Sequence, residues 1–227
     1  MGLIRAPDQY ALIENAYANA HKITRESHQE LINNEWEEMA RIADSIPSSW
    51  IRDAHDHLKK NGWGRTIATP YMLHHVTQWN VNQASAILIT TEDVAETYSN
   101  GSDGFIFPNA LIESNAVIPL TERSQLHHCN GLHHIKNEYV RLTGMNPSES
   151  QFHELYSCFP IAVRLQREAF ELGKRPGTIT GGMTFAGGPY NNFMVQGLSQ
   201  LAKQVRRSQT TGVITSVSGM LTKQGLI

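Results

Sequence analysis

Two adjacent segments, residues 153–172 and 178–197, constrain the fold of this chain more than any other part of its sequence. In each one, a short apolar run leads into a tight turn and then into a stretch whose apolar residues recur at helical spacing. The second run is the expected strand Thr178–Thr180, and Pro160 and Asn191 mark the starts of the two helices. Successive strand–turn–helix units are typical of an α/β protein, and they place both turns at one sheet edge, where ligands usually bind.

The first 60 residues are expected to be helical. Thr24 precedes a long amphipathic stretch and suits its N-cap position, and Pro47 ends that stretch. A shorter helix is expected over residues 50–60. Trp36 and Trp50 are expected to pack inward, so this part reads as a small helical subdomain.

The composition shifts after residue 65. Residues 84–90 form a continuous apolar run that predicts a strand buried on both faces of a sheet. Residues 100–104 read as a turn, and residues 105–118 as a second strand split near its proline. A helix is then expected over residues 126–144, and a strand-like run closes the chain.

Bulk properties exclude several classes of protein. The chain has 227 residues and a net charge of −2, so neither a basic surface for nucleic acid nor an acidic tail is present. No apolar run approaches the ~20 residues needed to span a bilayer, and the start lacks the apolar core of a signal peptide. Two cysteines are too few for a disulfide framework, which favours a reduced, cytoplasmic setting.

The run HHCNGLHH, residues 127–134, raises the question of a metal site. On a helix its histidines contain no pair four residues apart, and a bound metal needs three or four convergent ligands. A solvated helix face is therefore favoured, and no metal is expected.

Cys158 is the sharpest candidate for chemistry. A cysteine between a strand end and a helix N-terminus can have a lowered pKa and be reactive. The alternative is a small apolar filler, because free cysteines are among the most buried residues. The sequence around Cys158 leaves both readings open.

The runs YSCFP (156–160) and TGGMTFAGGPYNN (180–192) resemble the C-terminal half of the thiolase superfamily, in its branch of sterol-carrier-protein-type thiolases and acetyl-CoA acetyltransferase-like proteins. The resemblance implies a layered α/β fold with a mixed sheet, packing helices and an N-terminal helical loop subdomain. It divides the chain into three parts. Residues 1–64 correspond to the loop subdomain that covers the CoA site in relatives. Residues 65–104 correspond to the last strand and helix of the N-terminal half, and residues 105–227 to the C-terminal domain.

The resemblance also implies roles for particular residues. Cys158 matches the cysteine of an HDCF tetrapeptide that is proposed as an acid/base, and Tyr156 replaces its histidine, which in relatives helps to bind the thioester oxygen. A tyrosine still offers an O–H donor for a developing oxyanion. The implied substrate- and CoA-binding residues are Gly187, Gly188, Pro189, Asn191 and Asn192.

Three departures from the family pattern bear on activity. Gly188 stands where thiolases carry a histidine, and Gln196 and Gln224 stand where the nearest relatives carry others. Glutamine takes no proton at neutral pH, so the general base that a nucleophilic cysteine needs is not found at these positions. The segment that carries the thiolase nucleophile also has no counterpart in this sequence, so we expect a separate N-terminal-half subunit or a fragment.

The expected function is that of a thiolase-like acyltransferase that forms or cleaves carbon–carbon bonds in acyl-CoA thioesters, incomplete without an N-terminal half. Two alternatives remain: a non-catalytic thiolase-like subunit that binds CoA, and an enzyme of retro-aldol cleavage. Coenzyme A enters as substrate, and no cofactor is expected. The partners expected are acyl-CoA and either further copies of the chain or the separate subunit.

Overall fold

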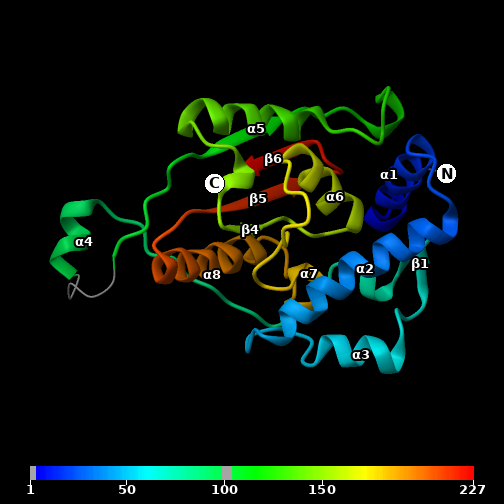
Figure 1. The fold of residues 1–227 in the computed structure, drawn as a ribbon, viewed down its shortest axis with the longest axis horizontal. Helices are drawn as coiled ribbons and strands as arrows, with labels where there is room; N and C mark the ends of the chain where they lie inside the picture. The colour runs from blue at the N-terminus through cyan, green and yellow to red at the C-terminus, as the bar shows by residue number, and fades with distance from the viewer. Residues whose placement is uncertain (1–3, 99–103) are drawn as a thin grey trace.

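A computed structural model describes residues 4–98 and 104–227 and shows a four-stranded sheet at the centre, in the order β3-β6-β5-β4 (Figure 1). The strands are β3 (Ile112–Asn115), β4 (Phe152–Glu154), β5 (Gly212–Ser218) and β6 (Lys223–Leu226). β4 and β5 run parallel, whereas β6 is antiparallel to both β3 and β5. The expected mixed sheet of an α/β fold is confirmed.

Helices cover both faces of this sheet. They are α5 (Asn130–Thr143), α6 (Pro160–Ala169), the short α7 (Gly182–Phe185) and α8 (Asn192–Ser208). Gly131 of α5 approaches Gln224, whereas Gly197 of α8 approaches Ile214. Gln224 of β6 lies opposite Val217 of β5, so the two side chains point to the same face of the sheet. Val217 is three residues from Ile214 on the same strand, and alternate side chains of a strand point to opposite faces, so Gln224 and Ile214 lie on opposite faces. α5 and α8 therefore sandwich the sheet.

Three helices at the N-terminus pack beside this body, together with a small hairpin. They are α1 (Ala6–Ala20), α2 (Arg25–Asp44) and α3 (Ala54–Asn61), and the hairpin is β1 (Thr66–Ala68) with β2 (Tyr71–Met72). Thr24 caps α2 as expected, since its Oγ1 accepts the Ser27 N–H at 3.2 Å. Trp36 is fully buried, and its indole N–H donates to Thr184 at 3.0 Å. The inward prediction for Trp50 is wrong, because 48% of that residue is exposed on the turn before α3.

The predicted strand over residues 84–90 is wrong. The segment runs extended without pairing to a strand of the described residues, and it ends at the short helix α4 (Glu92–Tyr98), which projects from the body (Figure 1). Leu88 is 90% exposed and Ile89 is 87% exposed. An apolar run becomes a strand only beside another strand that satisfies its backbone groups, and the described chain offers none here.

Two other predicted strands are also shorter or absent. Of residues 105–118 only Ile112–Asn115 pair, beginning after the proline that was expected to split the run. Thr178–Thr180 form no strand but wrap around the carboxylate of Glu154. The predicted turn at residues 100–104 lies outside the described residues except for its last one.

Helix termini follow local sequence more closely. The helix expected from residue 126 begins only at Asn130, and it ends at Gly144 in the left-handed conformation, as expected. The 3-10 turns are η1 (Leu73–His75), η2 (Leu120–Glu122) and η3 (Pro147–Glu149). A capping box at η3 joins Asn146 and Glu149.

Within the described residues, no helix is both long enough and apolar enough to cross a bilayer. The boundaries expected near residues 64 and 104 stay predictions.

Candidate functional site

The turn between β4 and α6 carries the two residues singled out for chemistry. The Tyr156 N–H donates to Thr215 Oγ1 at 2.9 Å, and its carbonyl accepts from Gln166 Nε2 at 3.0 Å. β5 and α6 thus hold the backbone of this turn from two sides. Pro160 then begins α6 at its first turn, as expected.

Cys158 is buried at the start of α6, and burial raises the pKa of its thiol to about 12. A hydrogen bond from Tyr10 opposes this rise but is the weaker effect. Tyr10 is itself fixed by stacking on Phe159, with ring centroids 4.3 Å apart. Of the two readings that the sequence left open, the pKa favours the buried thiol, because loss of water outweighs the favourable field of the helix N-terminus.

Tyr156 lies beside Cys158 and is half-buried, with its ring edge-on to Phe193 of α8 at 5.7 Å. Burial, followed by the charge of an ionised Cys158, raises the pKa of the phenol to about 12. Both side chains therefore carry their protons at neutral pH. They are equipped to donate a proton or a hydrogen bond, not to act as anions.

The glycine turn that follows α7 lies against this pair. Thr77 donates through its N–H and its Oγ1 to the Cys158 carbonyl, at 3.3 and 3.0 Å. The next residue, Gln78, accepts at its carbonyl from the Gly188 N–H at 2.9 Å. Residues 77–78 therefore bridge the two turns, although the strand expected before the second turn is absent. Gly187 has a φ of +98°, where a side chain would be strained.

Two amide side chains near the start of α8 have buried atoms without a hydrogen-bond partner. Asn192 Nδ2 and Gln196 Oε1 are buried, and neither has a hydrogen-bond partner among the described residues. Asn191 is exposed and its side chain does not cap the helix. The Pro189 carbonyl accepts the Asn192 N–H at 3.1 Å and so fixes the turn that leads into α8.

Gln224 lies in a different environment from Gln196. It lies on the face of the sheet covered by α5, where its Nε2 donates to Leu221 O at 2.7 Å and lies 3.5 Å from Cys129 Sγ. Burial raises the pKa of the Cys129 thiol as well. Neither glutamine supplies the missing base, and both cysteines are protonated at neutral pH.

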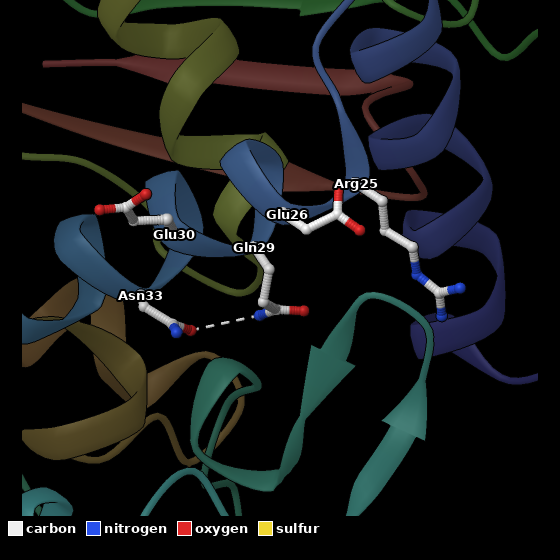
Figure 2. Close-up of a pocket in the computed structure, with 5 residues that line it drawn as sticks. All are labelled: Arg25, Glu26, Gln29, Glu30 and Asn33. Carbon is white, nitrogen blue, oxygen red and sulfur yellow. Dashed lines mark hydrogen bonds between the residues drawn. The ribbon is translucent and has the colours of Figure 1, made fainter.

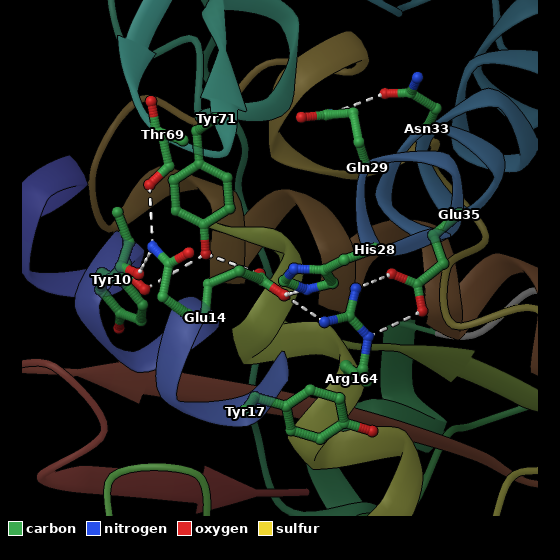
Figure 3. Close-up of polar contacts among 12 residues, drawn as sticks. Tyr10, Glu14, Tyr17, His28, Gln29, Asn33, Glu35, Thr69, Tyr71 and Arg164 are labelled. Carbon is green, nitrogen blue, oxygen red and sulfur yellow. Dashed lines mark hydrogen bonds and ion pairs between the residues drawn. The ribbon is translucent and has the colours of Figure 1, made fainter. Parts of the chain in front are cut away.

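A buried ionic cluster beside the site escaped the sequence analysis (Figure 3). The fully buried Glu14 pairs with Arg164 and accepts from His28 and Tyr71 at 2.7 and 2.8 Å. Arg164 also binds Glu35 at 2.6 Å. The sequence signal was a charged residue inside an otherwise apolar helix face, in α1 and again in α6. The cluster joins α1, α2 and α6 and so supports the Cys158 turn.

The histidines of residues 127–134 do not converge. His127 and His128 precede α5, and His128 stacks on His133 at 4.7 Å. No group of three or more His, Cys, Asp or Glu side chains within residues 4–98 and 104–227 could hold a metal ion.

Surface features do not add to the site. A hollow of about 450 Å³ lies along one face of α2 and is lined only by side chains of that helix, Arg25, Glu26, Gln29, Glu30 and Asn33 (Figure 2). The cationic side chains nearest to the end of α3 are Lys59, Lys60 and Arg65, and all three are exposed.

Comparisons with known proteins were made on sequence and on structure. No family model matches the chain, and no curated protein matches it either. Among solved structures, a monomeric SCP2-thiolase-like protein type 1 from Mycobacterium smegmatis superposes with a TM-score of 0.83 at 22% identity. The match covers 99% of this chain and 52% of that one.

An Ltp2-ChsH2(DUF35) aldolase superposes with a TM-score of 0.66 at 15% identity, over 96% of this chain and 62% of that one. The chain thus spans between half and two thirds of the length of these two neighbours. Together with the mixed sheet between helices and the two bridged turns, these superpositions show that the chain has a thiolase-like fold of the SCP2 type.

Proposed function

We propose that this chain supplies one half of a thiolase-like enzyme that forms or cleaves carbon–carbon bonds in acyl-CoA thioesters. The observation that carries the proposal is the bridge of residues 77–78, which brings the Cys158 turn against the glycine turn at the sheet edge. The fold likeness supports it. In this reading Cys158 fills the acid/base position and acts from its protonated form as the acid, Tyr156 donates to the thioester oxygen, and residues 187–192 shape the pocket wall.

The reaction needs groups beyond this chain. A thiolase forms an acyl-cysteine, yet the two cysteines here are buried and protonated, so neither is an activated nucleophile. The nucleophile and its base come from a complementing half. We infer that this half is a separate polypeptide or a further segment that carries the rest of the thiolase-like fold.

Exposed apolar side chains favour such a partner. Beyond Leu88 and Ile89, the set includes Ile87, Val94, Phe105, Ile106 and Phe107 on and around α4, and Leu111 and Val117 on either side of β3. A concentration of apolar surface on one part of a protein marks an interaction site. We expect that replacing Leu88 and Ile89 by Asp abolishes co-purification with the complementing half, whereas Leu142→Asp, at another exposed apolar position, on α5, leaves it intact. Equal recovery of both variants would remove this contact from the proposal, and self-association without the second polypeptide would favour a homo-oligomer.

Retro-aldol cleavage of a 3-hydroxyacyl-CoA is the second candidate. A base takes the hydroxyl proton, the C2–C3 bond breaks, its electron pair enters the thioester enolate, and an acid returns a proton to C2. Protonated Tyr156 and Cys158 fit the roles of oxyanion donor and acid, and this route requires no acylated cysteine. One of the two structural neighbours is named an aldolase complex.

The test is an assay of the chain co-expressed with a candidate complementing half. Thiolysis of acetoacetyl-CoA and aldol cleavage of a 3-hydroxyacyl-CoA are measured for wild type, Cys158→Ala and Tyr156→Phe. Loss of an acid/base is expected to cost about 10²- to 10⁴-fold in rate. Cys129→Ala is the matched control, because it removes the other buried thiol.

Unchanged rates in both site variants would refute the catalytic role. CoA binding that persists in an inactive assembly would then favour the third possibility, a non-catalytic subunit.

A further inference from the structure

Glu154, at the end of β4, is a buried carboxylate with an unusual set of partners. Thr178 Oγ1 donates to its two oxygens at 2.9 and 3.1 Å, and Thr180 Oγ1 donates at 3.0 Å. The N–H groups of Ile179 and Thr180 donate at 2.9 and 3.0 Å. All of these donors are uncharged and come from three successive residues. The carboxyl group thus holds a short stretch of chain through hydrogen bonds, and these partners form no ion pair with it.

The hydrogen bonds continue from this stretch into the next turn. Thr178 Oγ1 accepts from the N–H groups of Gly181 and Gly182, at 3.0 and 3.1 Å. Both glycines have positive φ angles, +95° and +73°, which glycine adopts without steric cost. The Met183 N–H donates to Ser157 Oγ at 2.9 Å. Residues 178–183 are therefore fixed both to β4 and to the residue between Tyr156 and Cys158.

The same network reaches the glycine turn. The Met183 carbonyl accepts from the Gln78 N–H at 3.1 Å, and Gln78 accepts from Gly188. Its neighbour Thr77 holds the Cys158 carbonyl. A path of hydrogen bonds thus runs from Glu154 to both turns of the site.

We propose that Glu154 is a positioning residue, whose carboxyl group holds the 178–182 turn and through it sets Gly188 relative to Cys158. A catalytic role for Glu154 rests on the proposed function. The dependence of the 178–182 turn on the Glu154 carboxyl group does not, because it follows from the hydrogen bonds alone.

Titration of Glu154 gives the proposal a distinctive signature. Burial raises the pKa of Glu154 to about 7, and the donors from residues 178–180 oppose that rise. On the same strand, His153 faces the other side of the sheet, and α8 and β5 present the uncharged Gly197 and Ile214. Tyr156, which follows in the turn, keeps its proton at neutral pH. Glu154 is therefore the group that changes charge here near neutral pH.

The direction of the effect follows from linkage. Opening the turn admits water, which returns the pKa of Glu154 towards its usual 4.5. The closed form then holds the proton more tightly than the open form between pH 4.5 and about 7, so opening becomes easier as the pH rises. We expect the opening constant to increase about tenfold per pH unit from pH 5 to 7 and to level off above that.

Amide hydrogen exchange in the full chain measures this without substrate. Exchange at residues 179–183 and at Gly188 is followed from pH 5 to 8 and corrected for the intrinsic rate of each amide. In Glu154→Gln, opening at these amides is expected to lose its pH dependence, because glutamine does not titrate. At pH 5 it is also expected to exceed that of wild type by at least about tenfold, because the amide NH2 group cannot accept from the donors of residues 178–180. Glu149→Gln is the control, because Glu149 also accepts a backbone N–H but is exposed.

Two results would overturn the proposal. Opening at residues 179–183 within twofold of wild type at pH 5 in Glu154→Gln would show that the carboxyl group does not hold the turn. Loosening there with unchanged exchange at Gly188 would show that it does not position the site. If Glu154→Gln does not fold, Thr178→Val removes the shared hydroxyl and leaves the carboxylate, and unchanged exchange at Gly181 and Gly182 would then refute the network. These exchange rates can be measured whether or not the enzymatic assays detect activity, so the two proposals can fail separately.

Discussion

Replacing Arg164 by Met tests whether the buried cluster of Figure 3 stabilises the fold. The Arg164 side chain is 5% exposed and is the cation that pairs with the fully buried Glu14. It also binds Glu35 through two nitrogens, at 2.6 and 3.3 Å. Methionine keeps much of the side-chain volume but removes the charge. Glu14 is then left with His28 and Tyr71 as its partners.

The expected cost is large, because it is the cost of an uncompensated buried charge rather than of a lost contact. Breaking a buried pair by removing one partner typically costs about 3–5 kcal/mol. A domain of ordinary stability has about 5–15 kcal/mol in total, so urea unfolding should shift clearly to lower midpoints. Arg141→Met is the matched control: Arg141 pairs with Glu138 at 2.8 Å while 66% exposed, so its loss should cost at most about 1 kcal/mol.

The pH dependence separates the charge effect from lost packing. In wild type the pKa of Glu14 is lowered, burial being outweighed by Arg164 and the hydrogen bonds, so its stabilisation is lost only as the pH falls below 4.5. In Arg164→Met we expect burial to raise that pKa above 4.5, which makes the deficit larger at pH 8 than at pH 5. The double variant with Glu14→Gln should recover part of the loss. A deficit below about 1 kcal/mol, or one equal at the two pH values, would refute the reasoning.

Three further predictions concern single contacts. Gly181→Ala should cost more than about 2 kcal/mol in urea unfolding, since a methyl group there would lie 2.4 Å from an atom of α2. The control Gly173→Ala meets no atom within 4 Å and should cost about 1 kcal/mol. Equal losses in the two variants would contradict this prediction. Cys158 should resist iodoacetamide at pH 8 in the folded protein and react at least about 100-fold faster once unfolded, because burial raises its pKa to about 12, and mass spectrometry of its peptide measures both rates. Thr184→Val should cost about 1–3 kcal/mol in thermal or urea unfolding by leaving the buried Trp36 indole N–H without an acceptor, and a neutral result would mean that another acceptor replaces it.

Local sequence determined the features that depend on neighbouring residues. Helical spacing and end signals located α1, α2 and α8, with Thr24 as a cap and Gly144 as a left-handed terminus. The run from Pro160 marked the start of α6, directly after the turn that carries Cys158, whereas the strand expected at residues 178–180 is absent. These features form because the residues that specify them are within a few positions of one another.

Tertiary structure decided what depends on distant partners. Residues 84–90 have the composition of a strand but find no strand to pair with, and Thr178–Thr180 use their donors on Glu154 instead of on a sheet. The protonation of Cys158 follows from how completely the fold removes water from its thiol, which no nearby residue reveals. Hydrogen-bond pairing and desolvation are set by atoms far away in the sequence. For that reason the sequence by itself located the candidate cysteine, while only the folded chain determined the state of its proton.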